Sequence, residues 1–497
     1  METVWILGDQ LRRDTGALAA YAPGQVRVLM VESDAKFADG RWHRQRLHFI
    51  LAAMRRFAEE LRLEGFSVDL RRASTLRAGL REHIAEFQPS RVVAMSPMSY
   101  DGRKMLERAG VHIVDNDQFL CSAESFAQWA GSRKSLKMED FYRWQRVQLD
   151  LLMDGDAPAG GKWNYDAENR EPPPKDGRSW PEPLFEQLDA IDEQVMLDIA
   201  ERAPQAFGAS PEGLWATTRA GALARLQNFI EEVLPLYGPH EDAVMQSEWK
   251  LAHSALSPYL NYWLLHLIEV VEAAHTAFQE GRIPIASAEG FIRQVIGWRE
   301  YVWGLYWLWM PEYRDLNMLN AASPLPASFT GAKTEMACVS HTIASIDDRA
   351  WVHHIERLMI LGNLSLTSGV NPQAVVEWMW KSFIDGAEWV MLPNVIGMAL
   401  YADGGQMSTK PYASGGAYIN RMSDHCSSCY FDPKKRTGEK ACPFTTLYWD
   451  FLARNEPSLR SNHRLSIPMG SMRKLKDLDA VQERGTEVRV RIAEGTL

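Results

Sequence analysis

The chain has 497 residues, of which 46% are hydrophobic and 24% are charged, and its formal net charge is −10. A chain of this length is too long for one compact core, so we expect two or three domains. The negative charge argues against indiscriminate nucleic-acid binding, and no stretch of about 18 uncharged apolar residues could span a membrane. Met1-Glu2-Thr3 runs directly into an apolar strand without a secretory signal, which predicts a cytoplasmic protein.

The first 120 residues alternate short β-branched runs with amphipathic stretches. The runs predict five strands, at residues 3–7, 26–31, 66–70, 91–95 and 111–115. The stretches predict helices at residues 48–63, 75–87 and 102–109. This alternation predicts a parallel sheet with helices on both faces and ligands beyond the carboxyl ends of its strands. No Gly-x-Gly-x-x-Gly follows a strand, so a Rossmann dinucleotide site is not supported.

A Pro/Gly-rich stretch at residues 154–183 reads as a long connector, or as a functional loop because residues 162–170 gather aromatic, amide and charged groups. After residue 185 we find no good strand. Helical periodicity predicts an all-helical second domain, with segments at 214–234, 287–309, 351–367, 372–383 and 445–454. We therefore expect an α/β domain at 1–130, a connector at 131–185 and a helical domain at 186–497.

Four of the five cysteines have the spacing of a metal centre. Cys426 and Cys429 form a Cys-x2-Cys pair, Cys442 follows thirteen residues later, and Cys338 lies 88 residues upstream. Four thiolates suit zinc or an iron-sulfur cluster. A zinc ribbon usually has two close pairs, so the remote Cys338 and the Cys442-Pro443 step favour a [4Fe-4S] cluster in the region of about 335–450. Reduced, unligated thiols are the alternative, and Cys121 is expected to be a small core residue.

A basic stretch lies beside these cysteines. Residues 431–476 contain ten Lys and Arg against four acids. This composition predicts a surface that binds phosphate groups. On charge alone, a surface whose charges are compensated locally is predicted equally well.

Several motifs in this order resemble the photolyase and cryptochrome family. The quoted segments are His253-Ser-Ala-Leu-Ser-Pro-Tyr-Leu-Asn, Phe291-Ile-Arg-Gln-Val-Ile-Gly-Trp-Arg-Glu, Gly8-Asp-Gln-Leu, Trp163-Asn-Tyr-Asp-Ala-Glu-Asn-Arg and Glu388-Trp-Val-Met-Leu-Pro-Asn-Val-Ile-Gly-Met. Together with the cysteines they narrow the resemblance to the iron-sulfur bacterial cryptochromes and photolyases. It covers nearly the whole chain and implies an α/β antenna domain followed by a large all-α FAD-binding domain.

The resemblance implies a set of FAD-binding residues. The diphosphate would be held at Ser254, Leu256 and Ser257, with Gln294 and Arg299 reaching in from the next helix. Arg357 and Asp385 would contact the polar edge of the isoalloxazine, and Met391 would lie near flavin N5. The alternative for Ser254 and Ser257 is ordinary capping of a Ser-Pro helix start.

His354 resembles the histidine that donates a proton to the lesion in (6-4) photolyases, with His353 as the second choice. At α-helical spacing His354 shares one face with Arg357, Leu358 and Leu361. A His with a pKa near neutrality suits general acid work, whereas a helix-packing His is the alternative.

Electron supply and substrate binding follow from the same resemblance. Trp378 matches the first electron donor to FAD, but Thr330 stands where relatives carry the next Trp, so the relay would use another residue such as Trp380. A flipped lesion in UV-damaged DNA would contact an apolar and aromatic lining of Leu358, Met398, Tyr412 and Tyr418.

Two further ligands are implied. The rim residues Asp9, Gln10 and Glu32 would bind an antenna chromophore, 6,7-dimethyl-8-ribityllumazine, although acidic rim residues also serve as helix caps. Asp166 lies where the branch has a functional loop and would approach a divalent cation such as Mg²⁺.

The function implied is light-dependent repair of (6-4) photoproducts by a monomeric enzyme. A cryptochrome-like blue-light regulator with the same cofactors is one alternative. A flavin-free iron-sulfur DNA-binding protein is the more distant one.

Overall fold

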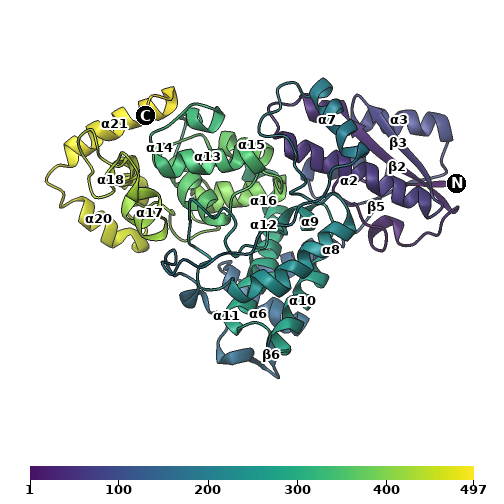
Figure 1. The fold of residues 1–497 in the computed structure, drawn as a ribbon, viewed down its shortest axis with the longest axis horizontal. Helices are drawn as coiled ribbons and strands as arrows, with labels where there is room; N and C mark the ends of the chain where they lie inside the picture. The colour runs from purple at the N-terminus through teal and green to yellow at the C-terminus, as the bar shows by residue number, and fades with distance from the viewer.

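The N-terminal part of the molecule is built on a parallel sheet (Figure 1). A computed structural model describes residues 1–497. Its five strands run parallel in the order β3-β2-β1-β4-β5. All five match predicted strands: β1 (Glu2–Trp5), β2 (Val26–Ser33), β3 (Ser67–Ala73), β4 (Val92–Met95) and β5 (His112–Val114). The order reverses between β1 and β4, which places the expected ligand crevice beyond the carboxyl ends of these strands.

The three predicted helices of this part are present, together with a short α1 (Asp34–Ala38). They are α2 (Arg44–Leu63), α3 (Leu76–Phe87) and α4 (Tyr100–Arg108). Side-chain caps fix the starts of two of them: Thr75 Oγ1 accepts from the Ala78 amide at 3.0 Å, and Ser99 Oγ accepts from the Gly102 amide at 3.2 Å. Because both caps follow strands, both helix starts face the crevice.

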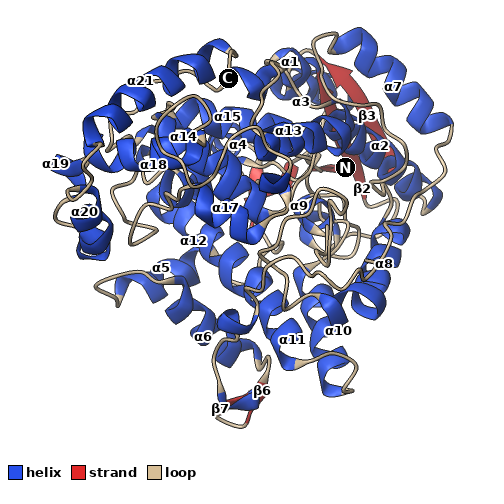
Figure 2. Cartoon of the chain, turned by 60° about the vertical axis from the view of Figure 1, so that its left-hand side comes forward, coloured by secondary structure: helices blue, strands red, loops and turns tan.

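After the sheet the chain is almost entirely helical, as predicted. The only later strands are the two-residue β6 (Met153–Asp154) and β7 (Ala157–Pro158), which pair at the opposite end of the molecule from the sheet (Figure 2). None of the helices is both long and apolar enough to cross a bilayer.

The remaining helices, in chain order, are α5 (Ala123–Gly131), α6 (Met138–Leu149), α7 (Ala190–Arg202), α8 (Arg219–Asn228), α9 (Ser257–Asn261), α10 (Leu267–Gln279), α11 (Ile285–Ile292), α12 (Glu300–Trp309), α13 (Ala337–Arg349), α14 (Asn363–Ser368), α15 (Pro372–Ser382), α16 (Glu388–Pro393), α17 (Gly416–Met422), α18 (Pro443–Arg454), α19 (Glu456–Leu459), α20 (Ser466–Met472) and α21 (Leu478–Glu494). In Figure 1, α7 lies beside the sheet, α6, α10 and α11 lie together at the bottom, α18, α20 and α21 lie together on the left, and α13 to α16 lie in the centre.

Helices α5 and α6 pack on the helical body, although the sequence suggested a connector from residue 131. Phe126 and Phe141 lie 5.9 Å from Tyr301 of α12, measured between ring centroids. The Pro/Gly content that signals a connector begins only after α6. Because α5 and α6 pack on the helical body, the irregular segment begins only after Leu149. The division of the chain into three parts remains a proposal.

Four π-helical segments interrupt the helices: η4 (Phe229–Val233), η6 (Arg293–Arg299), η9 (Glu356–Gly362) and η10 (Asn394–Ala399). Apolar periodicity predicted ordinary α-helix through 287–309 and 351–367, because one wide turn barely alters it. Such turns often occur at functional sites, and three of the four carry residues of the candidate site below.

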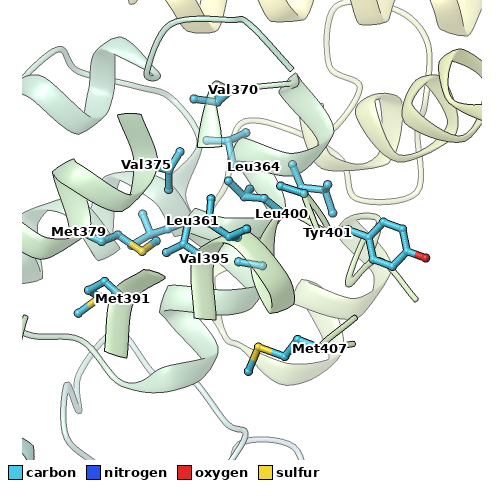
Figure 3. Close-up of a cluster of buried hydrophobic side chains, with 14 of the residues drawn as sticks. Leu361, Leu364, Val370, Val375, Met379, Met391, Val395, Leu400, Tyr401 and Met407 are labelled. Atoms are coloured by element: carbon cyan, nitrogen blue, oxygen red, sulfur yellow. The ribbon is translucent and has the colours of Figure 1, made fainter. Parts of the chain in front are cut away.

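The wide turn of η9 corrects one expectation. Leu361 does not share a face with His354, because it is fully buried and packs with Leu364, Val375 and Met379 in the core (Figure 3). An α-helix would have kept residues seven apart on one side, whereas a π-turn rotates them away from each other.

Candidate functional site

Asp385 is the centre of a buried polar network that joins three of the predicted cofactor-binding residues. Its carboxylate accepts a hydrogen bond from Ser257 Oγ at 2.6 Å and a two-pronged ion pair from Arg357 at 3.0 and 3.1 Å. Its backbone oxygen accepts from Asn261 Nδ2 at 2.6 Å. Residues from α9, from η9 and from the turn between α15 and α16 are therefore fixed against one another by charge-assisted bonds.

Arg299 extends this network but makes no ion pair. Its Nη1 donates to Asn261 Oδ1 at 2.5 Å, while its Nε is buried without a partner. The guanidinium lies 4.7 Å from the ring centroid of Trp389 and 4.8 Å from that of Phe119. Burial lowers the pKa of Arg299 to about 10. A buried guanidinium without a counter-ion fits an anionic ligand, such as the diphosphate of FAD.

Gln294 belongs to a second network. Its Nε2 donates to Glu241 Oε1 at 2.8 Å, and Tyr237 OH donates to the same oxygen at 3.0 Å. Burial raises the pKa of Glu241 to about 7. The side-chain amide of Gln294 is thus engaged by a carboxyl group, and its expected role at the FAD diphosphate stays a prediction.

The two serines do not cap helix α9. Ser257 is engaged by Asp385, and Ser254 Oγ accepts only from the Leu256 amide at 3.4 Å. Leu256 occupies the cap position, so the helix start has no side-chain cap. Capping therefore does not explain why these hydroxyls stand here, which leaves ligand binding as the better explanation.

Three histidines of the candidate site form a cluster: His253, His353 and His354. The rings of His253 and His353 stack with centroids 4.5 Å apart, and His354 lies 5.5 Å from His253. His253 Nε2 and both nitrogens of His353 are buried without hydrogen-bond partners. Burial lowers the pKa of both His253 and His353, so both rings are neutral near pH 7.

His354 differs from the other two histidines. Its side chain is 46% exposed, and its Nε2 lies 3.3 Å from Asp242 Oδ1. Desolvation opposes protonation, but the hydrogen bond to Asp242 and the charges of Asp242 and Glu241 outweigh it and raise the pKa of His354. His354 is therefore the accessible member of the cluster and the one whose pKa is raised, which suits the predicted proton donor.

Three of the four predicted substrate-contacting residues lie together. Leu358, Tyr412 and Tyr418 all pack against a small buried cluster of Val244, Ile355 and Met359. All three are partly exposed, as an apolar binding surface requires. Met398 on η10 instead packs against the large core.

Met391 and Trp378 are both buried in or against that core. Met391 is 4% exposed and lies beside Met379 in Figure 3. Trp378 stacks on Phe329 with centroids 4.4 Å apart and donates from Nε1 to the Phe329 oxygen at 2.9 Å. Its other aromatic neighbour is Phe383 at 6.2 Å.

The four predicted metal ligands line one small pocket. Cys338 lies in the first turn of α13, Cys426 and Cys429 lie in and after a short 3-10 turn (His425–Ser427), and Cys442 caps α18. Burial, followed by the charges of the other three thiolates, raises the pKa of Cys338. Such a group of thiolates is stabilised by a cation at its centre.

The spacing of the sulfur atoms bears on the choice of metal. The only three ligand atoms of His, Cys, Asp or Glu that all lie within 4.8 Å of one another belong to the histidine cluster. Sulfurs around one tetrahedral zinc would lie about 3.8 Å apart, given Zn–S bonds of about 2.3 Å. The wider cysteine site therefore fits a cluster better than a single ion.

The basic stretch beside the cysteines is only partly compensated. Lys435, Arg436, Arg454 and Arg473 form ion pairs. The other six form none: Lys434, Lys440, Arg460, Arg464, Lys474 and Lys476. Six exposed cations without an ion pair favour phosphate contacts over the compensated alternative.

A cavity of about 1290 Å³ lies at the predicted crevice, between the carboxyl ends of the strands and helices α15 and α16. Asp9 lines it, and burial raises the pKa of Asp9 to about 6. Glu32 also lines it but is fully engaged by Arg55 and Arg202. Gln10 does not line it, because its Nε2 donates to the Met95 and Ser96 oxygens at 3.3 and 3.5 Å. Asp9 is thus the one predicted rim residue free to bind a chromophore.

Asp166 does not have the surroundings of a cation site. Its carboxylate contacts two arginines, Arg293 at 3.1 Å and Arg170. A divalent cation requires several oxygen ligands and no competing guanidinium groups. The expected Mg²⁺ therefore does not fit these residues, and we derive nothing from it.

Sequence reasoning missed Asn261, Asp242 and Trp389, although each adjoins a predicted residue in space. Asn261 ends the quoted His253 motif and Trp389 is the second residue of the Glu388 motif, so their positions gave a signal. Asp242 lies 112 residues from His354, and no local pattern relates them.

Comparison with known proteins agrees with this arrangement. The family described as deoxyribodipyrimidine photo-lyase-related protein matches residues 4–215. A (6-4) photolyase of Agrobacterium fabrum (strain C58 / ATCC 33970) is 42% identical over 488 residues, covering 96% of each chain. An uncharacterized protein of Acanthamoeba polyphaga mimivirus is 29% identical over 109 residues, which are 22% of this chain and 81% of that protein.

The fold also has a solved counterpart. A bacterial class III photolyase from Agrobacterium tumefaciens superposes with a TM-score of 0.55 at 18% identity, covering 99% of this chain and 96% of that chain. The α/β sheet domain with a large helical domain is therefore the photolyase and cryptochrome architecture. Because its relative is 42% identical over 96% of each chain, the chain belongs to the family of iron-sulfur bacterial cryptochromes and photolyases. Membership implies a flavin cofactor and a DNA substrate.

Proposed function

We propose that the protein repairs (6-4) photoproducts in UV-damaged DNA by light-driven electron transfer from reduced FAD. The observation that carries this proposal is the pairing of His354 with Asp242. It puts an accessible imidazole with a raised pKa beside an apolar surface and next to the Asp385 network. The 42%-identical relative is a (6-4) photolyase, which supports the same choice of lesion.

The residues of the Asp385 network would hold the cofactor. FAD supplies an electron when it is reduced and excited by light, and the protein positions it and tunes its surroundings. Arg299 offers the buried cation for the diphosphate, with Ser254 and Ser257 beside it. Arg357 and Asp385 present fixed charge to the polar edge of the isoalloxazine.

His354 would transfer the proton. The carboxylate of Asp242 stabilises the imidazolium, so the ring holds its proton more tightly than an ordinary histidine does. A flipped dinucleotide would rest on Leu358, Tyr412 and Tyr418, which exclude water from the reacting bases. The neutral His353 is buried, with its Nε2 3.5 Å from Glu356 Oε2, and would be the second candidate for this role.

Two more groups complete the proposal. A [4Fe-4S] cluster would be bound by Cys338, Cys426, Cys429 and Cys442 and would hold the basic surface in place for DNA. A lumazine antenna would occupy the cavity lined by Asp9. We further propose that the protein acts as a monomer in the cytoplasm.

Repair of two defined substrates tests the function. Purified protein is reduced, illuminated with blue light and given an oligonucleotide with a single (6-4) photoproduct or a single cyclobutane dimer. We expect restoration of the (6-4) substrate alone, and loss of repair with retained flavin in His354→Ala. Repair of the cyclobutane dimer instead would contradict the choice of lesion. Absence of repair with a normal flavin would favour the blue-light regulator.

One absorption spectrum tests the cofactors. Flavin bands near roughly 450 nm, a lumazine band near roughly 420 nm and a broad iron-sulfur shoulder are expected. A flavin-free protein with the shoulder alone would support the iron-sulfur DNA-binding alternative. A colourless protein that contains zinc would contradict the whole proposal.

A further inference from the structure

The route by which an electron reaches the flavin is unusual in this chain. Trp378, the expected first donor, has only Phe329 and Phe383 as aromatic neighbours, and Thr330 is an exposed residue at the position of the missing Trp. Trp and Tyr can give up one electron at accessible potentials, whereas Phe and Thr cannot. A relay that begins at Trp378 therefore has no second residue that could pass an electron on to it.

Trp380, the other candidate, leads no further. Its one aromatic neighbour is Trp42 at 6.1 Å, and Trp42 is 7% exposed. Around Trp42 lie the cations Arg46 at 5.3 Å and Lys381 at 5.6 Å, which disfavour a positive charge on the indole.

A different chain of aromatic rings begins at Trp389, beside the proposed flavin site. Trp389 on α16 contacts Trp303 on α12 edge-to-face, with centroids 5.8 Å apart. Trp303 is parallel to Tyr306 at 6.5 Å and meets the edge of Trp307 at 5.5 Å. Trp303, Tyr306 and Trp307 share one face of α12 because they stand at positions i, i+3 and i+4. Trp307 is partly exposed and lies 6.4 Å from Tyr100, so the chain reaches the surface.

The end of this chain has its own proton acceptor. Tyr306 OH lies 3.1 Å from Glu388 Oε2 and accepts a hydrogen bond from the Tyr100 amide at 2.7 Å. Glu388 Oε1 lies 3.2 Å from Arg314, whose charge opposes the rise in the pKa of Glu388 that burial causes. A tyrosine loses its phenolic proton when it loses an electron, so a bonded carboxylate is the partner that such an oxidation requires.

Fixed charges give the chain a direction. Arg299 lies 4.7 Å from Trp389 and therefore destabilises a positive charge on that indole. Glu388 stabilises the oxidised form of Tyr306 at the other end by taking its proton. Both effects favour oxidation of the outer residue over oxidation of Trp389, so the oxidised site moves outward, away from the flavin.

We propose that Trp389, Trp303 and Tyr306 form the electron relay that reduces the resting flavin in light, with Glu388 as the proton acceptor. The inference rests on the proposed function, since it requires a flavin. Trp389 would give one electron to the photoexcited oxidised flavin. Trp303 would then reduce the oxidised Trp389, and Tyr306 would reduce the oxidised Trp303 while its phenolic proton moves to Glu388. A soluble thiol then returns an electron through Trp307, and Glu388 returns the proton to Tyr306.

Light-driven reduction of the flavin, followed at its visible absorption band in the presence of a thiol, tests the relay. We expect Trp303→Phe to slow this reduction by roughly tenfold or more, and Trp378→Phe to slow it less. Trp309→Phe is the matched control, because Trp309 lies on the same helix but stacks on Tyr313 at 4.9 Å, outside the chain. A normal rate in Trp303→Phe together with a lost signal in Trp378→Phe would overturn the relay.

A radical signature tests the end of the chain independently of repair. Transient absorption or electron paramagnetic resonance after a light pulse should show a tyrosyl radical in the native protein. Tyr306→Phe should replace it with a tryptophan radical, and Glu388→Gln should shorten the life of the tyrosyl signal. No change of radical type in Tyr306→Phe would refute the assignment. Repair by protein reduced beforehand with dithionite measures the proposed function without the relay, so failure of one is distinguishable from failure of the other.

Discussion

His354 Nε2 and Asp242 Oδ1 lie 3.3 Å apart, joining a histidine at the start of η9 to a carboxylate 112 residues earlier in the chain. This pair distinguishes His354 from the two neutral histidines stacked behind it. The pKa of the predicted proton donor therefore depends on a carboxylate that the sequence analysis did not select.

Asp242→Asn should narrow the pH range of repair. The native pair raises the pKa of His354, so the imidazolium is fully present at low pH and is lost as pH rises through that raised value. The variant removes the charge and moves the alkaline limb of the repair profile to lower pH. The rate against pH from 6 to 9 on dithionite-reduced protein measures this. Asp348→Asn, an exposed acid on α13, is the control, and an unmoved limb in Asp242→Asn would show that Asp242 does not set the titration.

Arg299→Gln should weaken flavin retention. Removing a buried charge that pairs with a diphosphate typically costs about 2–5 kcal/mol, so we expect the dissociation constant of FAD to rise by roughly 30-fold or more. Flavin content after gel filtration and titration of the apoprotein with FAD measure the effect. Arg282→Gln, exposed and paired only with Glu280, should retain FAD normally. Equal retention in both variants would place the diphosphate elsewhere.

Cys426→Ser should lose iron, acid-labile sulfide and the broad iron-sulfur absorption together. Each thiolate is one of four ligands, so loss of one destabilises the whole cluster. Cys121→Ser is the matched control, because Cys121 is 3% exposed in the core and distant from the other four along the chain. Zinc in place of iron in the native protein would contradict the argument from the sulfur spacing.

Glu300→Gln should stabilise the protein at alkaline pH. Burial raises the pKa of Glu300 to about 7 from an ordinary value of 4.5. Because the folded state holds the proton more tightly, the free energy of unfolding falls as pH rises from 4.5 to 7 and stays low above that range. The variant should therefore gain about 1–3 kcal/mol at pH 8 and little below pH 4.5.

Urea unfolding at pH 4.5 and pH 8 measures this difference. The amide can still accept the bond that the Cys121 amide donates to Glu300 Oε2 at 2.7 Å. Glu312→Gln, at an exposed acid with no unusual surroundings, should change neither value. A loss of stability in Glu300→Gln at pH 8 would mean that the carboxylate is paired rather than buried alone.

The sheet and most helices could be predicted from the sequence because they depend on local periodicity. All five strands follow from β-branched runs, and the cysteine spacing was sufficient to bring Cys338 to Cys426, Cys429 and Cys442. The α5 and α6 packing was missed, since nothing local distinguishes a helix on the body from one in a connector.

The finer geometry of the site depends on contacts that no local pattern records. Leu361 was misplaced because a π-turn and an α-turn share the same apolar pattern. Gln10 and Asp166 have suitable chemistry at suitable positions, yet backbone carbonyls and arginines occupy their side chains. Asp242 could be found only by bringing two distant segments together.

The wide separation of Cys338 from the other three cysteines has a consequence for the order of assembly. Three of the proposed ligands enter the chain only after residue 425, so no cluster can close during synthesis of the first four-fifths of the protein. Helix α21 packs on α18, whose N-cap is Cys442, and so connects the proposed cluster site to the last helix of the structure. With this ligand set, metal loading would have to wait until Cys442 has been synthesised, and the basic stretch beside the cysteines would gain its support only then.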